Sequence, residues 1–387
     1  MQLRPELARV TESPLVQIAT IAEGLPGSLK LCYGESDLPT PDFICRAADE
    51  AARAGHTFYT HTAGYTALRE AIAQKIHHLH GVTYRVPEIM ATVGGTMAIY
   101  TAIRATVGPG DNAVFLSPAY AVYVNGIIMA GGEPRPVPLA FDGSRFTLDL
   151  DRVRAAIDAN TRLLIINSPS NPTGWMATVD EQRALAGLAA ERGITILADE
   201  VYERLTFDAP IAPSMARIVD DKDGLIVVNS FSKTYSMTGW RLGWAQSGED
   251  TIRAMYKAAE FITSNPTAMV QQAGIVALRD GEPFVADLRD QYARRRLQVI
   301  AALSAMKGVA LPNPDGAFYA FARIDGLTDS AAFAERLVRE TGVAFAPGAC
   351  FGADGEGHIR ICFAVSEHTL ANALSRFDRY MADNAGA

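Results

Sequence analysis

The sequence predicts an α/β fold in which a mostly parallel β-sheet is covered by helices on both faces. Short β-rich runs alternate with amphipathic stretches through the middle of the chain, which is typical of βαβ units. The expected strands are Ala113–Leu116, Leu163–Ile166, Ile194–Leu197, Leu225–Val228 and Leu242–Ala245. The first four are mostly continuous apolar runs, as expected of parallel strands buried on both faces. Between them, Val179–Arg192 is predicted to be a helix that ends at Gly193.

The two ends of the chain follow a different pattern. A long charged helix is expected from Glu282 to about Met306, followed by short strands and further helices. The first ~40 residues contain no βα unit and are expected to pack with this smaller α+β domain. The predicted division is therefore an N-terminal arm and part of the small domain (1–42), a large domain (43–281), and a linking helix with the C-terminal small domain (282–387).

Composition and charge exclude several classes of function. The chain has 387 residues and a net charge of −8, which disfavours nucleic acid as a partner. Its one basic cluster, Arg294–Arg296, is interpreted as a solvated helix face. No apolar run approaches the ~20 residues of a membrane helix, and the N-terminus lacks the apolar core of a signal peptide. The four cysteines form no CxxC pattern, so free thiols in the cytoplasm are expected.

The three histidines of the segment HHLH, at positions 77, 78 and 80, invite a metal-binding interpretation. No cysteine or carboxylate at ligand spacing completes a four-ligand set. The polar end of a helix that begins near Ala67 explains them more simply. We therefore expect no metal site.

Polar side chains follow three of the expected strands, where open α/β sheets bind their ligands. They are Asn171 in NSPSNPTG, Asp199 in ADEVY, and Lys233 in NSFSK. Each has an ordinary explanation by itself: a turn around Asn171, a helix cap at Asp199, and a surface lysine at 233. Because the carboxyl ends of parallel strands meet at one edge of the sheet, we expect the three to converge on one crevice.

A glycine pair opens a fourth element of this crevice. The segment ATVGGTMAIYTAIRA, residues 91–105, predicts a helix whose first N–H groups could bind phosphate. Pyridoxal phosphate fits these parts, because its aldehyde needs a lysine, its ring nitrogen an acidic partner, and its phosphate N–H groups, hydroxyls and an arginine. Lys233 would form the Schiff base and then act as the base, and Asp199 would keep the ring nitrogen protonated. Ser230, Arg241 and the helix starting at Thr96 would hold the phosphate.

With these motifs in place, the chain resembles the fold-type I aminotransferases of class I and II. SPLVQIATIAEG, LCYGESDLPTPDFI, YTHTAGYTALREAI, PAYAVY, GAFYAF, VAFAPGACFG and HIRICFA carry the resemblance beside NPTG and the lysine block. It implies a large domain with a mostly parallel seven-stranded sheet and a smaller α+β domain. It also implies a homodimer with shared active sites, in which Tyr59 reaches the phosphate of the neighbouring subunit.

The resemblance extends the list of expected site residues. It implies catalytic roles for Lys233, Asp199 and Tyr202. It implies substrate contacts at Gly34, Asn171 and Arg360, with Arg360 binding the α-carboxylate. The cofactor contacts that it implies are Gly95, Thr96, Tyr120, Asn171, Asp199, Tyr202, Ser230, Ser232, Lys233, Arg241 and the neighbour's Tyr59.

The implied reaction is transfer of an amino group from an L-amino acid to a 2-oxo acid. The freed amine of Lys233 would move a proton from Cα of the substrate to the cofactor. Relatives that prefer aspartate often carry Lys where this chain has Thr96, and no arginine for a distal carboxylate is identifiable. An apolar, aromatic or other neutral substrate side chain is therefore at least as compatible as a dicarboxylate. Leu15, Tyr33 and Leu38 either line that pocket or simply pack within the N-terminal segment.

Several alternatives use the same residues. β-Elimination by a C–S lyase, decarboxylation or oxidation on the same fold would also need Lys233 and Asp199. Ser230–Lys233 also matches the S-x-x-K of penicillin-binding acyl enzymes, but no lysine is followed by Thr-Gly. A non-catalytic, cofactor-binding regulator is a further alternative, although family members of that kind carry a fused DNA-binding domain, which is not expected here.

Overall fold

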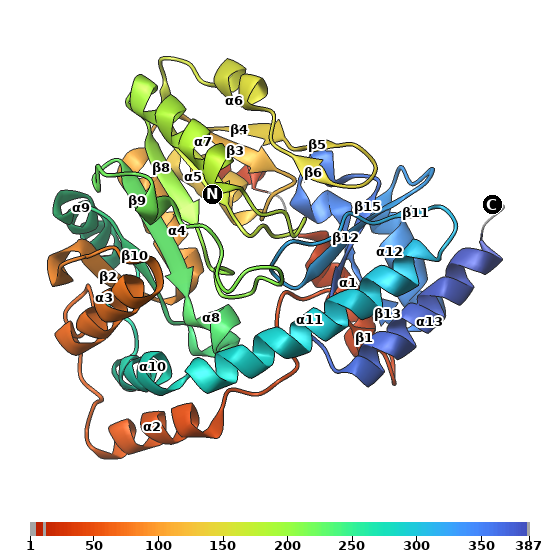
Figure 1. Ribbon diagram of the computed structural model, residues 1–387, viewed down its shortest axis with the longest axis horizontal. Coiled ribbons are helices and arrows are strands. Elements are labelled where there is room, and N and C mark those ends of the chain that lie inside the picture. Colours follow the sequence, from red (N-terminus) through yellow and green to blue (C-terminus); the bar gives the residue numbers. More distant parts are fainter. Residues whose placement is uncertain (1–4, 11–12, 385–387) are drawn as a thin grey trace.

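The computed structural model describes residues 5–10 and 13–384, and its centre is a seven-stranded sheet (Figure 1). The strands, in spatial order, are β2 (Ile89–Thr92), β10 (Gly243–Gln246), β9 (Leu225–Ser230), β8 (Thr195–Asp199), β7 (Thr161–Asn167), β3 (Asn112–Ser117) and β4 (Glu133–Pro138). Only β10 runs antiparallel to its neighbours. The predicted mostly parallel α/β sheet is therefore confirmed, and all five expected strands belong to it.

The sequence interpretation missed the two edge strands, β2 and β4. Strand β4 has the sequence EPRPVP, and its prolines cannot donate hydrogen bonds to a sheet ladder. Such a strand is tolerated only at an edge, where one side needs no partner. Strand β2 has only four residues, and α4 begins two residues after it ends. Its short apolar run therefore cannot be told apart from the apolar pattern of that helix in the sequence.

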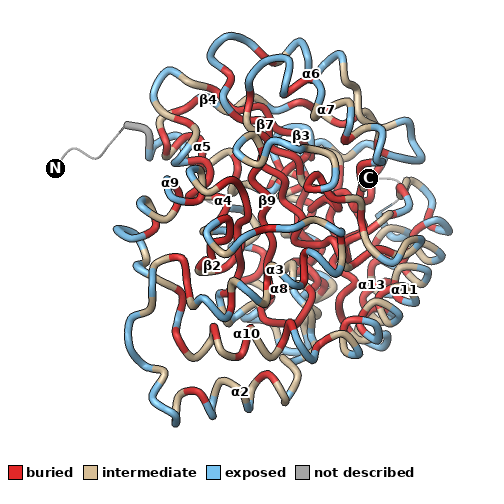
Figure 2. The backbone as a smooth tube through the Cα atoms, turned by 60° about the vertical axis from the view of Figure 1, so that its left-hand side comes forward, coloured by how far each residue is buried: buried red, intermediate tan, exposed pale blue. Residues whose placement is uncertain are grey.

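Helices cover both faces of this sheet and bury alternate residues of each strand. Helices α4 (Gly94–Thr106), α5 (Val122–Ala130) and α9 (Glu249–Glu260) pack on one face. The side chains that they cover on this face include Leu197 of β8. The other face is covered by α3 (Thr66–His80), α6 (Leu150–Ala156), α7 (Val179–Arg192) and α10 (Ala268–Asp280), which carries α2 (Asp42–Arg53) outside it. Figure 2 shows β9 and α4 buried and α2 at the surface. Asp199 shares the α4 face with Leu197, because side chains alternate along a strand.

The predicted helix 179–192 has the bounds that the sequence indicated. Thr178 and Glu181 form a capping box at its start, and Gly193 ends it with a left-handed φ of 63°. A residue with a Cβ would be strained in that conformation, which explains why a glycine stands there. The helix fixes the crossover between β7 and β8, whose ends carry Asn167 and Asp199.

A second, smaller sheet lies beside the first. Strands β11 (Val309–Ala310), β12 (Tyr319–Ile324), β15 (His358–Cys362) and β14 (Ala346–Pro347) form it, all antiparallel. Around it lie α1 (Pro14–Glu23), α11 (Glu282–Ser304), α12 (Ser330–Thr341) and α13 (Glu367–Asp383). Strand β1 (Leu29–Lys30) pairs in parallel with β13 (Val343–Ala344), which joins the N-terminal segment to this part of the chain. In Figure 1 the helix α11 runs from α10 to α12.

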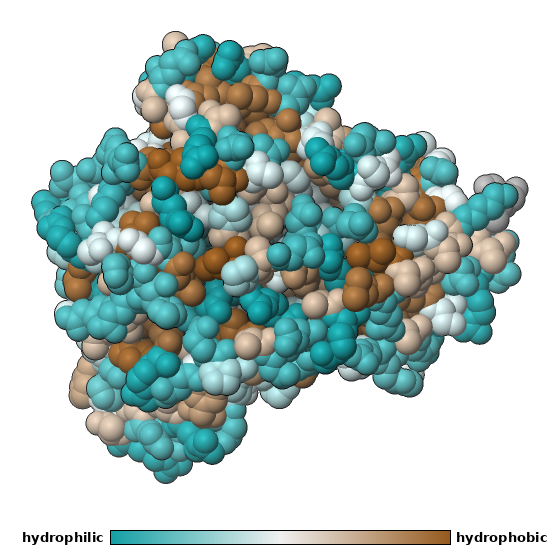
Figure 3. Space-filling view, viewed as in Figure 1, coloured by the Kyte–Doolittle hydropathy of each residue, from teal (hydrophilic) through white to brown (hydrophobic). Residues whose placement is uncertain are grey.

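The basic cluster on α11 is not a solvated face, which corrects the sequence interpretation. Arg294 is exposed beside Glu367, but Arg295 is only 5% exposed. The Arg296 guanidinium lies 5.1 Å from the ring centre of Phe207 and donates to the Pro314 carbonyl. Three consecutive helical residues spread around the helix, so a helix covered on one side cannot expose all of them. Figure 3 shows hydrophilic residues over much of this face of the molecule, with hydrophobic areas between them.

The HHLH segment ends a helix, α3, as expected, but this helix end is not exposed throughout. His80 is 7% exposed, and its Nε2 lies 2.8 Å from Glu203 Oε2. His77 and His78 belong to the same last turn of α3. Among residues 5–10 and 13–384, no group of three His, Cys, Asp or Glu side chains is arranged to hold a metal ion. No helix within those ranges is long and apolar enough to cross a membrane.

Candidate active site

A cavity of about 270 Å³ opens at the carboxyl ends of β7, β8 and β9, between the start of α4 and the small sheet. It brings together every site residue expected from the sequence except Tyr59. These are Leu15, Gly34, Gly95, Thr96, Tyr120, Asn171, Asp199, Tyr202, Ser230, Ser232, Lys233, Arg241 and Arg360. Tyr33 also lines the cavity, whereas Leu38 packs against the hydrophobic core instead.

Lys233 lines this cavity and belongs to the short helix α8 (Phe231–Thr234), which directly follows β9. Its Nζ donates a hydrogen bond to the Gly34 carbonyl oxygen at 2.6 Å. Burial lowers the pKa of Lys233 to about 8. Near neutral pH a minor but appreciable fraction of these side chains is therefore the neutral amine that a nucleophile or a base requires.

Asp199 ends β8, lines the same cavity and is 3% exposed. Its Oδ2 accepts a hydrogen bond from the Tyr123 hydroxyl at 2.5 Å. Burial raises the pKa of Asp199 to about 6, and the bond from Tyr123 opposes that rise. The sequence reasoning missed Tyr123, although the segment PAYAVY holds a signal: Tyr123 follows Tyr120 by one helical turn and lines the same cavity.

One end of the cavity is built to receive an anion. The N–H groups at the start of α4 face it, beside the hydroxyl of Ser230 and the guanidinium of Arg241. Gly94 has a φ of 78°, and a Cβ there would lie 2.4 Å from Arg241 Nη2. The missing side chain of Gly94 thus lets the guanidinium approach the helix start. Arg241 has no carboxylate partner within 4.0 Å among the described residues, so an anionic ligand group can pair with it.

The opposite end of the cavity holds another cation, Arg360 of β15, which unlike Arg241 is buried, with 3% of its surface exposed. Its Nη1 donates to Asn171 Oδ1 at 2.8 Å, and its Nη2 donates to the Cys32 carbonyl. The guanidinium lies over the Tyr319 ring, 4.6 Å from its centre, while its buried Nε has no hydrogen-bond partner in the described chain. A buried cation without an anionic partner is costly, and a bound carboxylate would relieve that cost.

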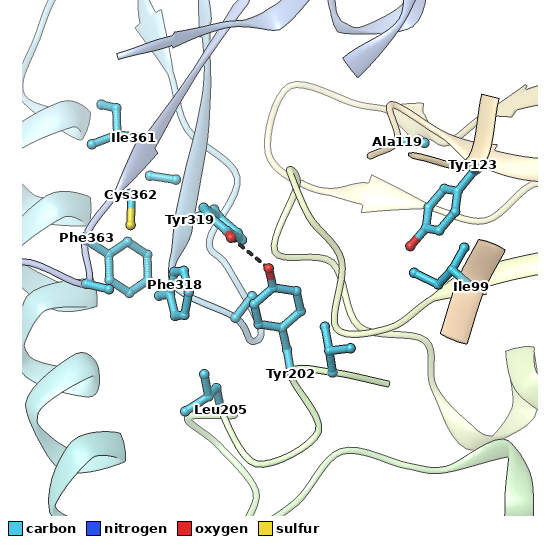
Figure 4. Packing of buried hydrophobic residues seen from close by; sticks show 14 of the residues in the cluster. Ile99, Ala119, Tyr123, Tyr202, Leu205, Phe318, Tyr319, Ile361, Cys362 and Phe363 are labelled. Carbon is cyan, nitrogen blue, oxygen red and sulfur yellow. Dashed lines mark hydrogen bonds between the residues drawn. The ribbon is translucent and has the colours of Figure 1, made fainter. Parts of the chain in front are cut away.

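Between the two ends, the Tyr202 hydroxyl lies 2.7 Å from the Tyr319 hydroxyl (Figure 4). Tyr202 belongs to the turn after β8, and Tyr319 begins β12 of the small sheet. Tyr319 is a second cavity residue that the sequence reasoning did not single out. Its segment, GAFYAF, contributes to the family resemblance but carries no local pattern typical of a cavity residue.

The two remaining tyrosines are placed very differently. Tyr120 lies at the rim of the cavity, 39% exposed, with its ring centre 6.2 Å from that of Tyr123. Tyr59 is 90% exposed, does not line the cavity of its own chain, and follows Phe58, which is 80% exposed. The structure of a single chain therefore leaves the expected role of Tyr59 as a prediction.

The residues present fit pyridoxal phosphate on three counts. A buried amine, an anion-binding helix start with an arginine, and a buried carboxylate surround one cavity. Gly94 provides the space that the anion-binding end needs. Arg360 lines the same cavity and is paired with no carboxylate among the described residues, so it can bind the carboxylate of a second ligand.

Comparisons with known proteins agree with this chemistry. The sequence profile described as aminotransferase class I and II matches residues 26–377. The chain is 34% identical over 385 residues to aromatic-amino-acid aminotransferase 2 of Thermococcus litoralis, with 98% of each protein covered. It is 36% identical over 403 residues to the aspartate/prephenate aminotransferase of Cereibacter sphaeroides, again covering 98% of each. A solved single mutant of Thermus thermophilus aspartate aminotransferase superposes with a TM-score of 0.91 at 34% identity, covering 98% of this chain and 99% of that one.

These matches extend over nearly the whole chain, and they confirm the expected fold-type I architecture. They also confirm the expected activity over the alternatives of acyl enzyme and regulator. The protein is an enzyme that uses pyridoxal phosphate and takes amino acids and oxo acids as substrates. The chain belongs to the class I and II aminotransferases.

Proposed function

We propose that Lys233 holds the cofactor and that its Nζ moves the substrate proton during transfer of the amino group from an L-amino acid to a 2-oxo acid. When bound, pyridoxal phosphate supplies an aldehyde that condenses with amines and a ring that accepts electrons. The neutral Nζ accepts the Cα proton of the amino acid and later returns it. One observation carries this proposal: the Lys233 amine lies inside the cavity with its pKa lowered to about 8.

The other cavity residues would hold the cofactor from all sides. Asp199, positioned by the Tyr123 hydroxyl, would pair with the ring nitrogen, and Tyr120 would stack on the ring. Asn171 uses its Oδ1 to accept from Arg360, which leaves its Nδ2 to donate, with the Tyr202 hydroxyl, to the phenolic oxygen. The phosphate would contact Gly95, Thr96, Ser230, Ser232 and Arg241.

Gly94→Ala is expected to weaken binding of pyridoxal phosphate about tenfold or more. A left-handed residue with a Cβ costs roughly 1–2 kcal/mol, and the new methyl group would displace the Arg241 guanidinium. A loss of 1.4 kcal/mol corresponds to a factor of ten in affinity. Titration of the apoenzyme with the cofactor, followed by absorbance, measures this change.

Gly187→Ala is the matched control for that variant. Gly187 lies inside α7, and a Cβ there meets nothing within 4 Å. The change should leave the cofactor affinity unchanged and raise the helix stability slightly. If the Gly94→Ala variant and the wild type bind pyridoxal phosphate with equal affinity, the Arg241 guanidinium does not need the space that a Cβ of Gly94 would occupy.

Arg360 would bind the α-carboxylate of both substrates at the small-sheet end of the cavity. The fork of a guanidinium suits a carboxylate, because two parallel hydrogen bonds can form. Asn171 and the Cys32 carbonyl hold the guanidinium in place. Gly34 would contact the carboxylate through its backbone, and its missing side chain leaves room for the Tyr319 hydroxyl.

The substrate side chain is proposed to be neutral. The cations that line the cavity, among the described residues, are Lys233, Arg241 and Arg360, and each has another task in this scheme. The side chains that remain nearby include Leu15, Tyr33 and Ile99. An apolar or aromatic side chain would be favoured there over a second carboxylate, whose burial without a cation is costly.

The enzyme should therefore convert phenylalanine, leucine or methionine with a kcat/KM at least about tenfold above that for aspartate. The test is single-turnover absorbance of the cofactor with each amino acid, without oxo acid, together with assay of the oxo acid released. Thr96→Lys would place a cation at the cavity wall and should shift the ratio toward aspartate. Thr96→Met, of similar length and no charge, should not. A wild-type preference for aspartate would contradict the proposed side-chain class.

A homodimer with shared active sites is proposed on the basis of the exposed aromatic residues. Phe58 and Tyr59 lie in a segment that Gln271 ties to the loop after α9, since its amide donates to both Thr60 Oγ1 and the Pro266 carbonyl. That loop carries Phe261, which is 87% exposed. Exposed aromatic residues gathered in this way are typical of a contact surface. Tyr59 of one subunit would then reach the phosphate bound by the other.

Mixing two inactive variants should restore activity if the sites are shared. A heterodimer of Lys233→Ala and Tyr59→Ala chains has one site with both changes and one site with neither. After denaturation and refolding together, the mixture should recover about a quarter of the wild-type activity, because half of a random mixture is heterodimer. The separately refolded variants are the controls. No recovery, despite dimers in analytical sedimentation, would place Tyr59 at the cofactor of its own chain.

The division of the chain into parts and its location in the cell are also proposals. The pairing of β1 with β13 supports assigning residues 1–42 to the arm and small domain, beside 43–281 and 282–387. The four cysteines are free, and Cys32, Cys350 and Cys362 are buried. Unpaired, buried thiols are compatible with a reducing cytoplasm.

A further inference from the structure

Tyr319 touches three groups of the proposed active site at once. Its hydroxyl lies 2.7 Å from the Tyr202 hydroxyl, and its ring lies under the Arg360 guanidinium, 4.6 Å from centre to Cζ. Its hydroxyl also fills the space where a Cβ of Gly34 would stand. Figure 4 shows the two hydroxyl groups pointing toward each other, Tyr319 from the small sheet and Tyr202 from the turn after β8.

The direction of the hydrogen bond between these hydroxyls decides what Tyr202 can do. A tyrosine hydroxyl has one hydrogen, so it can donate to only one partner. If Tyr202 donates to Tyr319, it has no hydrogen left for the cofactor. If Tyr319 donates to Tyr202, the Tyr202 hydrogen is free for the cavity. Burial raises the pKa of both hydroxyls, so both keep their protons at neutral pH.

We propose that Tyr319 is a positioning residue that donates its hydroxyl hydrogen to Tyr202 and so aims the Tyr202 hydrogen at the phenolic oxygen of the cofactor. A hydroxyl that accepts one hydrogen bond is a stronger donor in the next, because the two bonds polarise each other. The effect is largest where water is excluded, and both tyrosines are buried, with exposures of 3% and 0%. This inference rests on the proposed role of Tyr202.

Replacing Tyr319 by Phe removes the donor and keeps the ring. The ring contacts with Tyr202 and Phe318, at centre distances of 5.7 and 4.8 Å, need no hydroxyl. The ring beneath Arg360 is also kept, so binding of the substrate carboxylate should hardly change. If the role of Tyr319 were purely structural, the Tyr319→Phe change would therefore leave the visible absorption of the bound cofactor and its pH dependence unchanged.

The readout is the pH midpoint of the visible absorption of the enzyme with its cofactor. A donor at the phenolic oxygen stabilises negative charge there, and that charge is largest after the nitrogen joined to Lys233 loses its proton. Loss of the donor therefore raises the midpoint. Tyr202→Phe should raise it by about 1 to 2 pH units, the size of a hydrogen bond to a charged group. Tyr319→Phe should raise it by about 0.5 of a unit through its effect on Tyr202.

The double variant separates this role from others. In the Tyr202→Phe background, Tyr319→Phe should give no further shift, because its effect runs through the Tyr202 hydroxyl. Tyr292→Phe, which removes another buried hydroxyl outside the cavity, is the control and should leave the midpoint unchanged. An unchanged midpoint in Tyr319→Phe would overturn the inference about Tyr319 and leave the proposed role of Tyr202 standing. The same shift from Tyr319→Phe in the wild type and in the Tyr202→Phe variant would do so too. An unchanged midpoint in Tyr202→Phe would overturn the role of Tyr202 as well.

Discussion

Lys233→Ala should lower kcat by roughly 10⁴-fold or more and remove the visible absorption of cofactor bound to a lysine. The variant loses both the amine that holds the cofactor and the base that moves the substrate proton, and general base catalysis alone contributes 10²- to 10⁴-fold. The phosphate contacts proposed for Ser230, Arg241 and the start of α4 remain. The variant should therefore still bind pyridoxal phosphate, more weakly, as a free aldehyde. Steady-state kinetics and absorbance spectra of the purified variant test both parts.

Lys307→Ala is the matched control, because Lys307 is exposed and lies outside the cavity. It should keep the wild-type spectrum and rate. A Lys233→Ala variant that retains more than a few per cent of the wild-type kcat would refute the assignment of the base. A variant that loses its rate but keeps the lysine-bound absorption would show that another lysine holds the cofactor.

Asp199→Asn should lower kcat/KM by about 10²- to 10³-fold. A carboxylate buried beside the ring nitrogen keeps that nitrogen protonated, and removal of one partner of a buried charged pair costs about 2–5 kcal/mol. An amide of the same shape can still accept from Tyr123, so the packing around it should survive. The electron-accepting capacity of the ring falls with its charge, and the proton transfer at the substrate Cα slows accordingly. Single-turnover kinetics measure the loss.

A cofactor analogue with a methyl group on the ring nitrogen, and hence a fixed positive charge, should restore part of the rate of Asp199→Asn. Glu200→Gln is the control, since Glu200 is also buried but accepts from the Met215 backbone N–H. It should change the rate far less. Activity of Asp199→Asn within about fivefold of the wild type would contradict the proposed pairing of Asp199 with the ring nitrogen.

The main features of the cavity could be predicted because they depend on local rules. Asn171, Asp199 and Lys233 each follow an apolar run, and parallel strands bring their carboxyl ends to one edge. The order β9–β8–β7 then makes these three side chains neighbours. The glycine pair that begins α4 indicated a helix start at the same edge, and Gly95 lines the same cavity.

Tyr123 and Tyr319 were missed because a buried tyrosine has the same sequence pattern as a core residue. Their roles depend on contacts made across more than 70 residues, Tyr123 to Asp199 and Tyr319 to Tyr202, which no local pattern records. Arg295 was misplaced for a similar reason. A run of arginines indicates a solvated surface, and only the tertiary packing of α11 shows which of them is covered.

The most direct test of the central claim is to find which lysine holds the cofactor. The chain has six lysines, at positions 30, 75, 222, 233, 257 and 307. Reduction of the yellow enzyme with borohydride, followed by digestion and mass spectrometry, fixes the cofactor to the lysine that bears it. Modification of the peptide containing Lys233, and loss of that modification after prior incubation with a substrate amino acid, is the predicted result. Modification at another lysine, or at none, would contradict the assignment of Lys233.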